Sequence, residues 1–586
     1  MKELLNDSHT KRFEKYLFLI LILANTTPLL YTYYIGSLDG PKHIQIANII
    51  KELWMGNPLF DKFFEFSPFY TANVLSHYIL AFERLFLPAW ISEKLLLLFY
   101  VIMIPFGFRY LVFSLTTQPG WGYFLILPTT YTSLFFLGFY NYSLAYVFLF
   151  FSIGYYVRNH KSMNWRKMLI LGCLILLTYY SHFFVYGFLM IILALIFLHH
   201  LTFEVIDSPT EKRKLLLIHK IRDILMPALP SLIMAVAYFD LILRQPTSQE
   251  ALEFDRWNYL VGFRMLIGFV IPVELPMTMF LFWVVLAIFA YTVVMILIHA
   301  KRRRFELTLM KIIRSKKFLW AILTLLFFLL YFLMPNSLNA AGNILTRIII
   351  MAVYILLIWL SLWNKHFIIN VLIVIALFIY SIVNYQKHID YRMELDKTIL
   401  KITEIEDKIP ENSVIVCKNY LDSWNAFHFQ SYIGADKPFF NINSLAISPL
   451  FAVKWKKDRP QTFIGTKFSD AYTYYINVPN ASGTFIANYV VITGKSGFEK
   501  TPESDKFKLI LKENYQRITE AGNSVVDLYR LNIKDDLNRI QDSLRSNTMT
   551  LDRMRDISNK TKISEEDFMM REAIGILNNR IELHKN

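Results

Sequence analysis

The sequence predicts a polytopic α-helical membrane protein that ends in a polar, extracytoplasmic α/β domain. Of its 586 residues, 55% are hydrophobic and only 18% are charged, whereas a soluble domain carries about a quarter charged residues. Apolar stretches near 20 residues recur along the first two thirds of the chain, and a helix of that length crosses a bilayer. The net charge of +15 concentrates in short loops between these stretches, which is typical of a membrane protein and argues against a nucleic-acid partner.

Eleven stretches are expected to span the membrane. They are residues 16–35, 91–114, 121–137, 142–157, 168–184, 186–201, 224–243, 276–298, 318–334, 348–363 and 367–383. The first follows Lys11, Arg12 and Lys15 and contains no charge, so we expect a cytoplasmic N-terminus and an anchor that is not cleaved. An odd number of spans then places the C-terminal domain outside the cytoplasm.

One further stretch, residues 68–88, is ambiguous because it contains three ionisable side chains. Loops 158–167, 211–222 and 301–317 carry 4, 5 and 8 Lys or Arg residues. If 68–88 does not span, all three loops are cytoplasmic, as the positive-inside rule requires. We therefore expect a helix lying at the outer membrane surface, within a first external loop formed by residues 36–90.

The composition becomes polar after the last predicted span. A helical linker is expected over 385–409, and short runs of β-forming residues predict strands at 414–417, 489–493, 515–519 and 525–531. The chain thus divides into a transmembrane module (1–384), an extracytoplasmic α/β domain (385–532) and a charged helical tail (533–586).

The first external loop opens with Leu-Asp-Gly-Pro-Lys-His, residues 38–43. A carboxylate at the membrane boundary can accept a proton from a sugar or protein hydroxyl, which suggests Asp39 as a general base. The alternative is that Asp39 caps the helix that follows it. Charged residues are nearly absent from the middle of the spans, which argues against an ion-coupled transporter.

Several short motifs accompany Asp39. They are Ala47, Leu53-Trp54 and Gly56, then Ser67-Pro68-Phe69-Tyr70, Gly138-Phe139-Tyr140-Asn141-Tyr142, and Pro335, Gly342 and Arg347. Together with the arrangement of spans, they resemble the GT-C superfamily of membrane glycosyltransferases, which includes protein O-mannosyltransferases, aminoarabinose transferases and oligosaccharyltransferases. The resemblance covers residues 1 to about 385. It implies a polyprenyl-phosphate sugar donor used at the outer face, with Asp39 as the base.

A phosphate leaving group requires cations at the interface. Arg347 opens the tenth predicted span, and the resemblance implies that it meets the lipid phosphate. Lys42 is a further candidate, as are Arg256 and Arg264 in the external loop 244–275. The alternatives are interfacial snorkelling for Arg347 and ordinary loop charges for Arg256 and Arg264.

Other polar side chains on the outer side are candidates for binding the substrate. They are His43, His77, His182, Tyr140, Asn141 and Glu65. No three residues fall at a metal-ligand spacing. Many GT-C members pair two acids in the first loop, but Gly40 follows Asp39 here. A divalent cation stays an open alternative that paired acids do not support, and no cofactor is certain.

These features predict a glycosyltransferase in the cytoplasmic or inner membrane, acting on its extracytoplasmic side. It would move a sugar from a polyprenyl-phosphate donor to a hydroxyl of a glycan, lipid or protein acceptor. Two alternatives stay open: an enzyme similar to O-antigen polymerases or ligases, and a non-enzymatic transporter or assembly scaffold.

Overall fold

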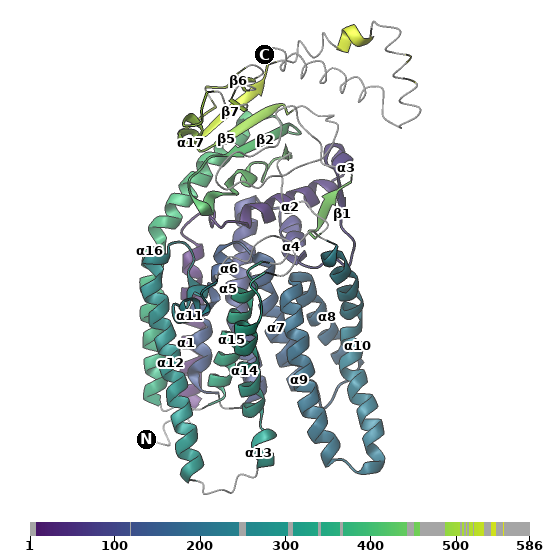
Figure 1. The fold of residues 1–586 in the computed structure, drawn as a ribbon, viewed down its shortest axis with the longest axis vertical. Coiled ribbons are helices and arrows are strands. Elements are labelled where there is room, and N and C mark those ends of the chain that lie inside the picture. Colours follow the sequence, from purple (N-terminus) through teal and green to yellow (C-terminus); the bar gives the residue numbers. More distant parts are fainter. Residues whose placement is uncertain are drawn as a thin grey trace.

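The computed structural model places a long helical bundle at one end of the molecule and a β-sheet at the other (Figure 1). It describes residues 8–532 apart from 118, 245–253, 303–308, 338–341, 364–366, 442–449, 457–486, 504–506, 509–510, 513–514 and 520; beyond 532 it describes 541–545, 552 and 555. The predicted tail over 533–586 therefore lies almost entirely outside the described residues.

Seven helices in the described part of the chain are long and apolar enough to cross a membrane. They are α5 (Ala89–Leu115), α9 (Phe183–Asp207), α10 (Thr210–Leu243), α12 (Ile271–Arg302), α14 (Lys316–Leu333), α15 (Ile344–Ser361) and α16 (Phe367–Thr403). Each coincides with one of the eleven predicted spans. By the length and composition of these helices, the chain is an integral membrane protein.

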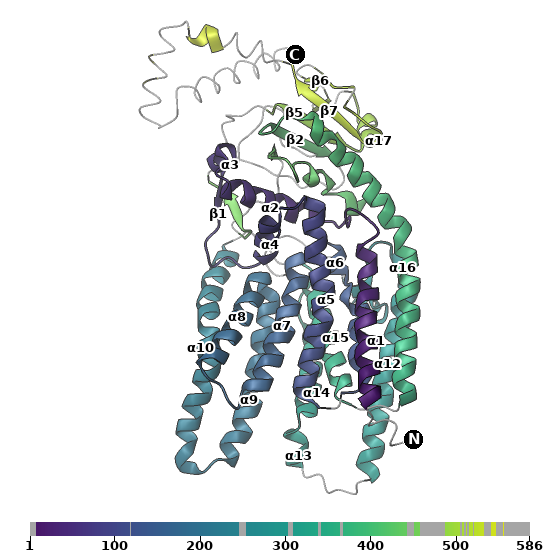
Figure 2. The same cartoon turned by 180° about the vertical axis from the view of Figure 1, so that it is seen from behind.

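Three more predicted spans correspond to helices of the same bundle (Figure 2). They are α1 (Ser8–Thr26), α7 (Tyr140–Asn159) and α8 (Trp165–Ser181). Helix α1 ends well before the predicted limit at residue 35, because Pro28 lacks the N–H that would continue the helical hydrogen bonds. Only a short 3-10 helix, Thr27–Leu29, follows. The total of eleven spans stays a prediction.

The prediction that residues 121–137 form one continuous helical span is wrong. This stretch is broken into two 3-10 helices, η3 (Trp121–Ile126) and η4 (Pro128–Thr130), and one turn of helix, α6 (Ser133–Phe136). Pro128 interrupts the helical hydrogen bonds. Irregular backbone at membrane depth is tolerated only where protein covers it, and η3 packs against α5, α15 and α16.

The basic loops meet at the end of the bundle that lies opposite the sheet. The Lys220 ammonium donates to the His160 carbonyl (3.1 Å), and Arg314 pairs with Asp207 (2.8 Å). Lys316 donates to the carbonyl of Leu115, the last residue of α5 (3.3 Å). All three predicted cytoplasmic loops thus lie on one side, as a cytoplasmic location requires, while the identity of that side stays a prediction.

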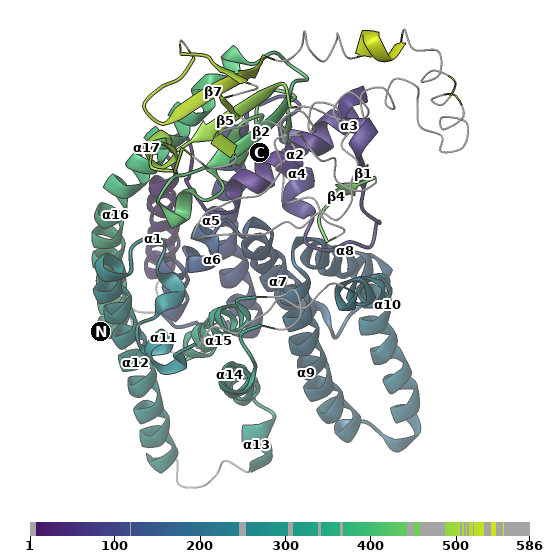
Figure 3. The ribbon, with the colours of Figure 1, turned by 45° about the horizontal axis from the view of Figure 1, so that its top comes forward.

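The loop predicted to be the first external one, residues 36–90, contains short helices between the bundle and the sheet (Figure 3). They are α2 (Gly40–Trp54), α3 (Pro58–Phe63) and α4 (Leu75–Glu83). Helix α4 occupies the middle of the predicted surface helix 68–88 but is shorter. Strand β1 (Phe64–Phe66) pairs antiparallel with β4 (Val453–Trp455), which ties this loop to the C-terminal part of the chain.

In the described part of the chain, five strands form the C-terminal sheet, in the order β3-β2-β5-β7-β6. They are β2 (Val414–Asn419), β3 (Phe440–Asn441), β5 (Tyr489–Thr493), β6 (Tyr515–Arg517) and β7 (Val526–Leu531). Four of them coincide with the predicted strands. The predicted boundary at residue 385 lies inside α16, which continues to Thr403 and connects the bundle to the sheet without a break.

Candidate functional site

The segment 138–142 packs directly against the start of α2 and positions Asp39. The Asp39 N–H donates to the Leu137 carbonyl (3.0 Å). Gly138 has a φ of +82°, and a Cβ atom there would lie 2.4 Å from the Gly40 nitrogen and 2.9 Å from the Asp39 nitrogen. Only glycine permits this approach, so the segment 138–142 sets the position of the Asp39 backbone.

The Asp39 side chain occupies the N-cap position of α2 but makes no capping hydrogen bond. Its Oδ1 atom lies 3.0 Å from the Lys42 ammonium and 3.6 Å from His428 Nε2, and the side chain is 25% exposed. Both close contacts fall on Oδ1. Among the described residues, Oδ2 is thus the oxygen left for an incoming hydroxyl, and helix capping does not explain this aspartate.

His428 reaches Asp39 from the C-terminal part of the chain, between the 3-10 helices Trp424–Ala426 and Phe429–Tyr432. Burial, assisted by the Lys42 charge, lowers the pKa of His428 to about 2. His428 is therefore neutral at physiological pH, and Lys42 is the cation beside Asp39. No local sequence signal connects His428 to a residue almost 390 positions earlier.

A second carboxylate, Glu93, supports the Asp39 segment from the interior. It is completely buried near the start of α5. The Tyr140 and Tyr432 hydroxyls donate to it at 2.5 and 3.2 Å, and the Tyr140 oxygen also lies 2.8 Å from Ser37 Oγ. Tyr140, predicted to bind substrate, is placed here as a support for the loop. Sequence reasoning did not assign Glu93, Ser37 or Tyr432.

His43 and His77 form a buried pair beside this network. Their Nδ1 and Nε2 atoms are 2.8 Å apart, and the His43 ring also stacks on Tyr140. Burial lowers the pKa of both rings, that of His43 to about 4. Both are neutral near pH 7, so one ring donates and the other accepts. Neither ring therefore brings a positive charge to a phosphate.

Arg347 lies in the first turn of α15 among three aromatic rings. Its guanidinium carbon is 5.7–5.8 Å from the ring centres of Phe139, Tyr142 and Phe184. Among the described residues it pairs with no carboxylate, and its Nε has no hydrogen-bond partner. Arg347 therefore keeps a free Nε–H donor between the rings, as expected of an anion-binding guanidinium.

His182 contacts Tyr142, one of the three rings around Arg347. It lies between α8 and α9, its ring meets Tyr142 edge-to-face at 5.1 Å, and its Nδ1 accepts the Phe184 N–H. The segment 138–142 thus contacts Asp39 at its first residue and both Arg347 and His182 at its last. The structure brings these predicted residues together around one five-residue segment.

The other predicted residues have partners elsewhere. The Asn141 amide accepts from Ser76 N–H (2.7 Å) and donates to the Asn73 carbonyl (2.6 Å), which holds the start of α4. Arg256 donates to carbonyls at the C-terminal end of α14, including that of Met334 (3.0 Å). Such contacts satisfy a helix end.

Glu65 and Arg264 make none of the contacts described above. Glu65 pairs with Lys454 (2.9 Å) across the β1–β4 ladder. Arg264 begins the 3-10 helix η5 (Arg264–Leu266), which packs against α6 and α15, and its Nε is buried without a partner. The described residues bring no three His, Cys, Asp or Glu side chains together as potential metal ligands.

Comparison with known proteins adds little to this picture. No protein-family model matches the sequence, and no curated protein matches it. Among solved structures, the chain is similar to the crystal structure of the oligosaccharyltransferase of Archaeoglobus fulgidus in the apo form. The identity is 14% and the TM-score is 0.42, over 82% of this chain and 70% of that chain. We base no conclusion on a likeness of this strength.

Proposed function

We propose that this protein is a glycosyltransferase that moves a sugar from a polyprenyl-phosphate donor to an acceptor hydroxyl at the outer surface of the membrane. The observation that carries the proposal is Asp39: a partly exposed carboxylate, rigidly placed and not used as a helix cap. It lies where the bundle meets the C-terminal domain, around the same segment as an unpaired arginine.

Asp39 acts as the general base. The acceptor hydroxyl approaches Oδ2 and gives its proton to the carboxylate as its oxygen attacks the anomeric carbon of the sugar. The bond from that carbon to the phosphate oxygen breaks, and polyprenyl phosphate leaves with both electrons. The buried Glu93 carboxylate and the Tyr140 hydroxyl hold the Asp39 segment during this step.

Lys42 and Arg347 stabilise the phosphate that leaves. Lys42 already contacts Asp39 Oδ1 and can turn toward a phosphate beside it. The planar guanidinium of Arg347 matches two phosphate oxygens at once. The surrounding rings exclude water, which strengthens the electrostatic attraction. The neutral His43–His77 pair is suited to sugar hydroxyls.

The C-terminal domain takes part in the site and does not merely follow it in sequence. His428 contacts Asp39, and Tyr432 donates to Glu93. An acceptor that reaches Oδ2 must therefore pass beside this domain, so we assign it a role in admitting glycan, lipid or protein acceptors.

The proposal is tested with purified protein in lipid nanodiscs and a panel of radiolabelled polyprenyl-phosphate sugars. We expect release of free polyprenyl phosphate from at least one donor when an acceptor is present. Asp407→Asn is the matched control, since Asp407 is exposed and pairs with Lys437 away from the site. If folded protein consumes no donor in the panel, the transferase proposal fails and a transporter or scaffold is favoured.

A further inference from the structure

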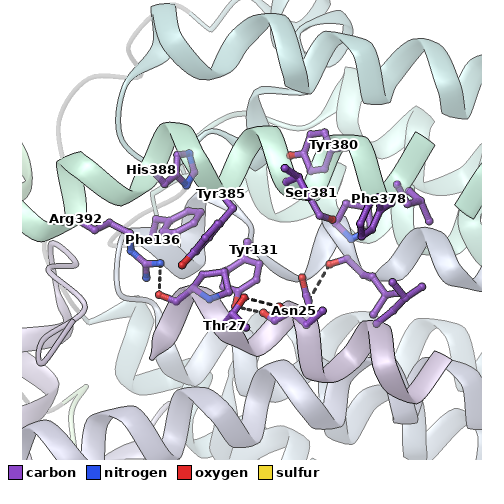
Figure 4. Close-up of a pocket in the computed structure, with 17 residues that line it drawn as sticks. Asn25, Thr27, Tyr131, Phe136, Phe378, Tyr380, Ser381, Tyr385, His388 and Arg392 are labelled. Carbon is purple, nitrogen blue, oxygen red and sulfur yellow. Dashed lines mark hydrogen bonds between the residues drawn. The ribbon is translucent and has the colours of Figure 1, made fainter. Parts of the chain in front are cut away.

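A cavity of about 180 Å³ lies between α1 and α16 (Figure 4), and Asp39 is not among the residues that line it. Helix α16 lines it from Leu377 to Arg392, a length of roughly 22 Å at 1.5 Å per residue. Leu377 lies within the predicted span 367–383, whereas Arg392 lies beyond its outer end. The cavity therefore extends from the hydrocarbon depth to the membrane interface.

The two ends of the cavity differ in polarity. Phe378 lies at the deep end, whereas Arg392, His388 and Tyr385 gather toward the other (Figure 4), and Leu21 adds to the apolar lining. The lining residue Phe378 is 54% exposed at the deep end, so an apolar part of the wall is accessible from outside the bundle. This shape suits an amphiphile with a polar head and an apolar chain.

Arg392 provides an unpaired cation at the polar end. It is only 4% exposed, and one guanidinium nitrogen donates to the Pro28 carbonyl (2.8 Å). Its Nε and second terminal nitrogen are buried without partners. A buried, incompletely paired charge is costly, so these donors indicate a site for an anion.

The neighbouring acids are already engaged. Asp396, one turn further along α16, accepts the N–H groups of Tyr33 and Tyr34 at 3.0 and 2.8 Å. Glu274 accepts backbone N–H groups, including that of Gly268 (2.6 Å), and lies 3.0 Å from His388 Nε2. Among the described residues, no carboxylate pairs with Arg392.

We propose that this cavity binds a bilayer phospholipid, with its phosphate on Arg392 and one acyl chain along the apolar wall toward Leu21 and Phe378. Guanidinium recognises phosphate through paired hydrogen bonds, and the exposed apolar opening admits a chain directly from the bilayer. Neither Asp39, Lys42 nor Arg347 lines the cavity, so a lipid here does not present its phosphate to the proposed base. The inference stands whether or not the protein transfers sugars.

The test counts bound lipid by native mass spectrometry while purified protein is titrated with dioctanoyl phosphatidylglycerol. We expect one saturable site, weakened about ten- to a hundredfold in Arg392→Gln, since charge-assisted hydrogen bonds are lost. Arg517→Gln is the matched control, because Arg517 pairs with Asp527 in the C-terminal sheet and does not line the cavity; it should bind this lipid like the wild type. Dioctanoylglycerol lacks the phosphate and inorganic phosphate lacks the chain, so each alone should bind at least tenfold more weakly.

A second variant keeps the test decisive if Arg392→Gln fails to fold. Ser381→Trp fills the cavity from its exposed wall and leaves Arg392 in place; it should also abolish the site. Wild-type binding in both variants would overturn the proposal, as would equal binding of inorganic phosphate or of dioctanoylglycerol. Displacement of the phospholipid by a lower concentration of a short polyprenyl phosphate would assign the cavity to that lipid and would equally overturn it.

Discussion

Replacing Gly138 with alanine should impair the site by moving the Asp39 backbone. The φ of +82° is unfavourable for alanine, at a cost of about 1–2 kcal/mol. The added methyl would also lie 2.4 Å from the Gly40 nitrogen, where ordinary contact begins at 3.4 Å. Relieving that overlap requires the two segments to separate by about 1 Å and costs about 1–3 kcal/mol more.

The expected result is a loss of activity larger than the loss of stability suggests. A misplacement of about 1 Å lowers the rate of an oriented reaction about a hundredfold. Gly56→Ala is the matched control, because Gly56 has a φ of +71° but nothing within 4 Å of an added Cβ. It measures the backbone cost alone and should keep near-normal transfer.

Both variants are compared with the wild type by thermal unfolding and by release of polyprenyl phosphate from a labelled donor. Gly138→Ala should unfold at a lower temperature than Gly56→Ala and lose about two orders of magnitude in rate. If the two variants behave alike in both measurements, the contact between Gly138 and the Asp39 segment does not position the base, and the reasoning from this approach is refuted.

Three further results are expected. Arg347→Ala should raise the donor KM about ten- to a hundredfold, with partial rescue by Lys; an unchanged KM would reduce Arg347 to a snorkelling residue. Because burial lowers the pKa of His43 to about 4, the unfolded chain binds its proton first as pH falls below about 6.5. Its contribution to stability is thus complete above pH 6.5 and declines by about 3 kcal/mol toward pH 4. Between pH 6.5 and pH 4, the unfolding temperature of His43→Gln should therefore fall less steeply than that of the wild type. The same dependence of unfolding temperature on pH in both proteins would contradict this prediction. In a background without the two native cysteines, an impermeant maleimide should label Leu400→Cys in intact cells and not Met310→Cys; the reverse pattern would overturn the predicted sidedness.

Much of the fold follows from patterns that are local in sequence. Long apolar runs predicted the helices α5, α9, α10, α12, α14, α15 and α16, and β-forming runs predicted four strands of the C-terminal sheet. Residues 121–137 are as apolar as a span, so composition alone did not reveal that Pro128 and tertiary packing divide them. Similarly, the sequence stays apolar beyond Thr26, so hydropathy alone did not show that α1 ends there.

The candidate site was predictable only in part. Asp39, Lys42 and Arg347 stand out because charges at the outer ends of apolar runs are conspicuous. His428 and Tyr432 reach the site through contacts across more than 330 residues, which no periodicity records. Tyr140 and Asn141 were noticed as polar residues at an external turn, but their hydroxyl and amide groups are directed to Glu93 and Ser76. The sequence identifies polar side chains, but only the folded structure shows which groups they bond to.

The most direct test of the account is the transfer rate of Asp39→Asn in folded protein. The substitution preserves size and capping ability, and Asp39 makes no capping hydrogen bond to lose, so the unfolding temperature should stay near that of the wild type. The account predicts that transfer falls about 10²–10⁴-fold, the usual worth of a general base, while Asp407→Asn keeps its activity. Near-normal turnover in the folded Asp39→Asn variant would contradict the account and would remove this carboxylate from the mechanism.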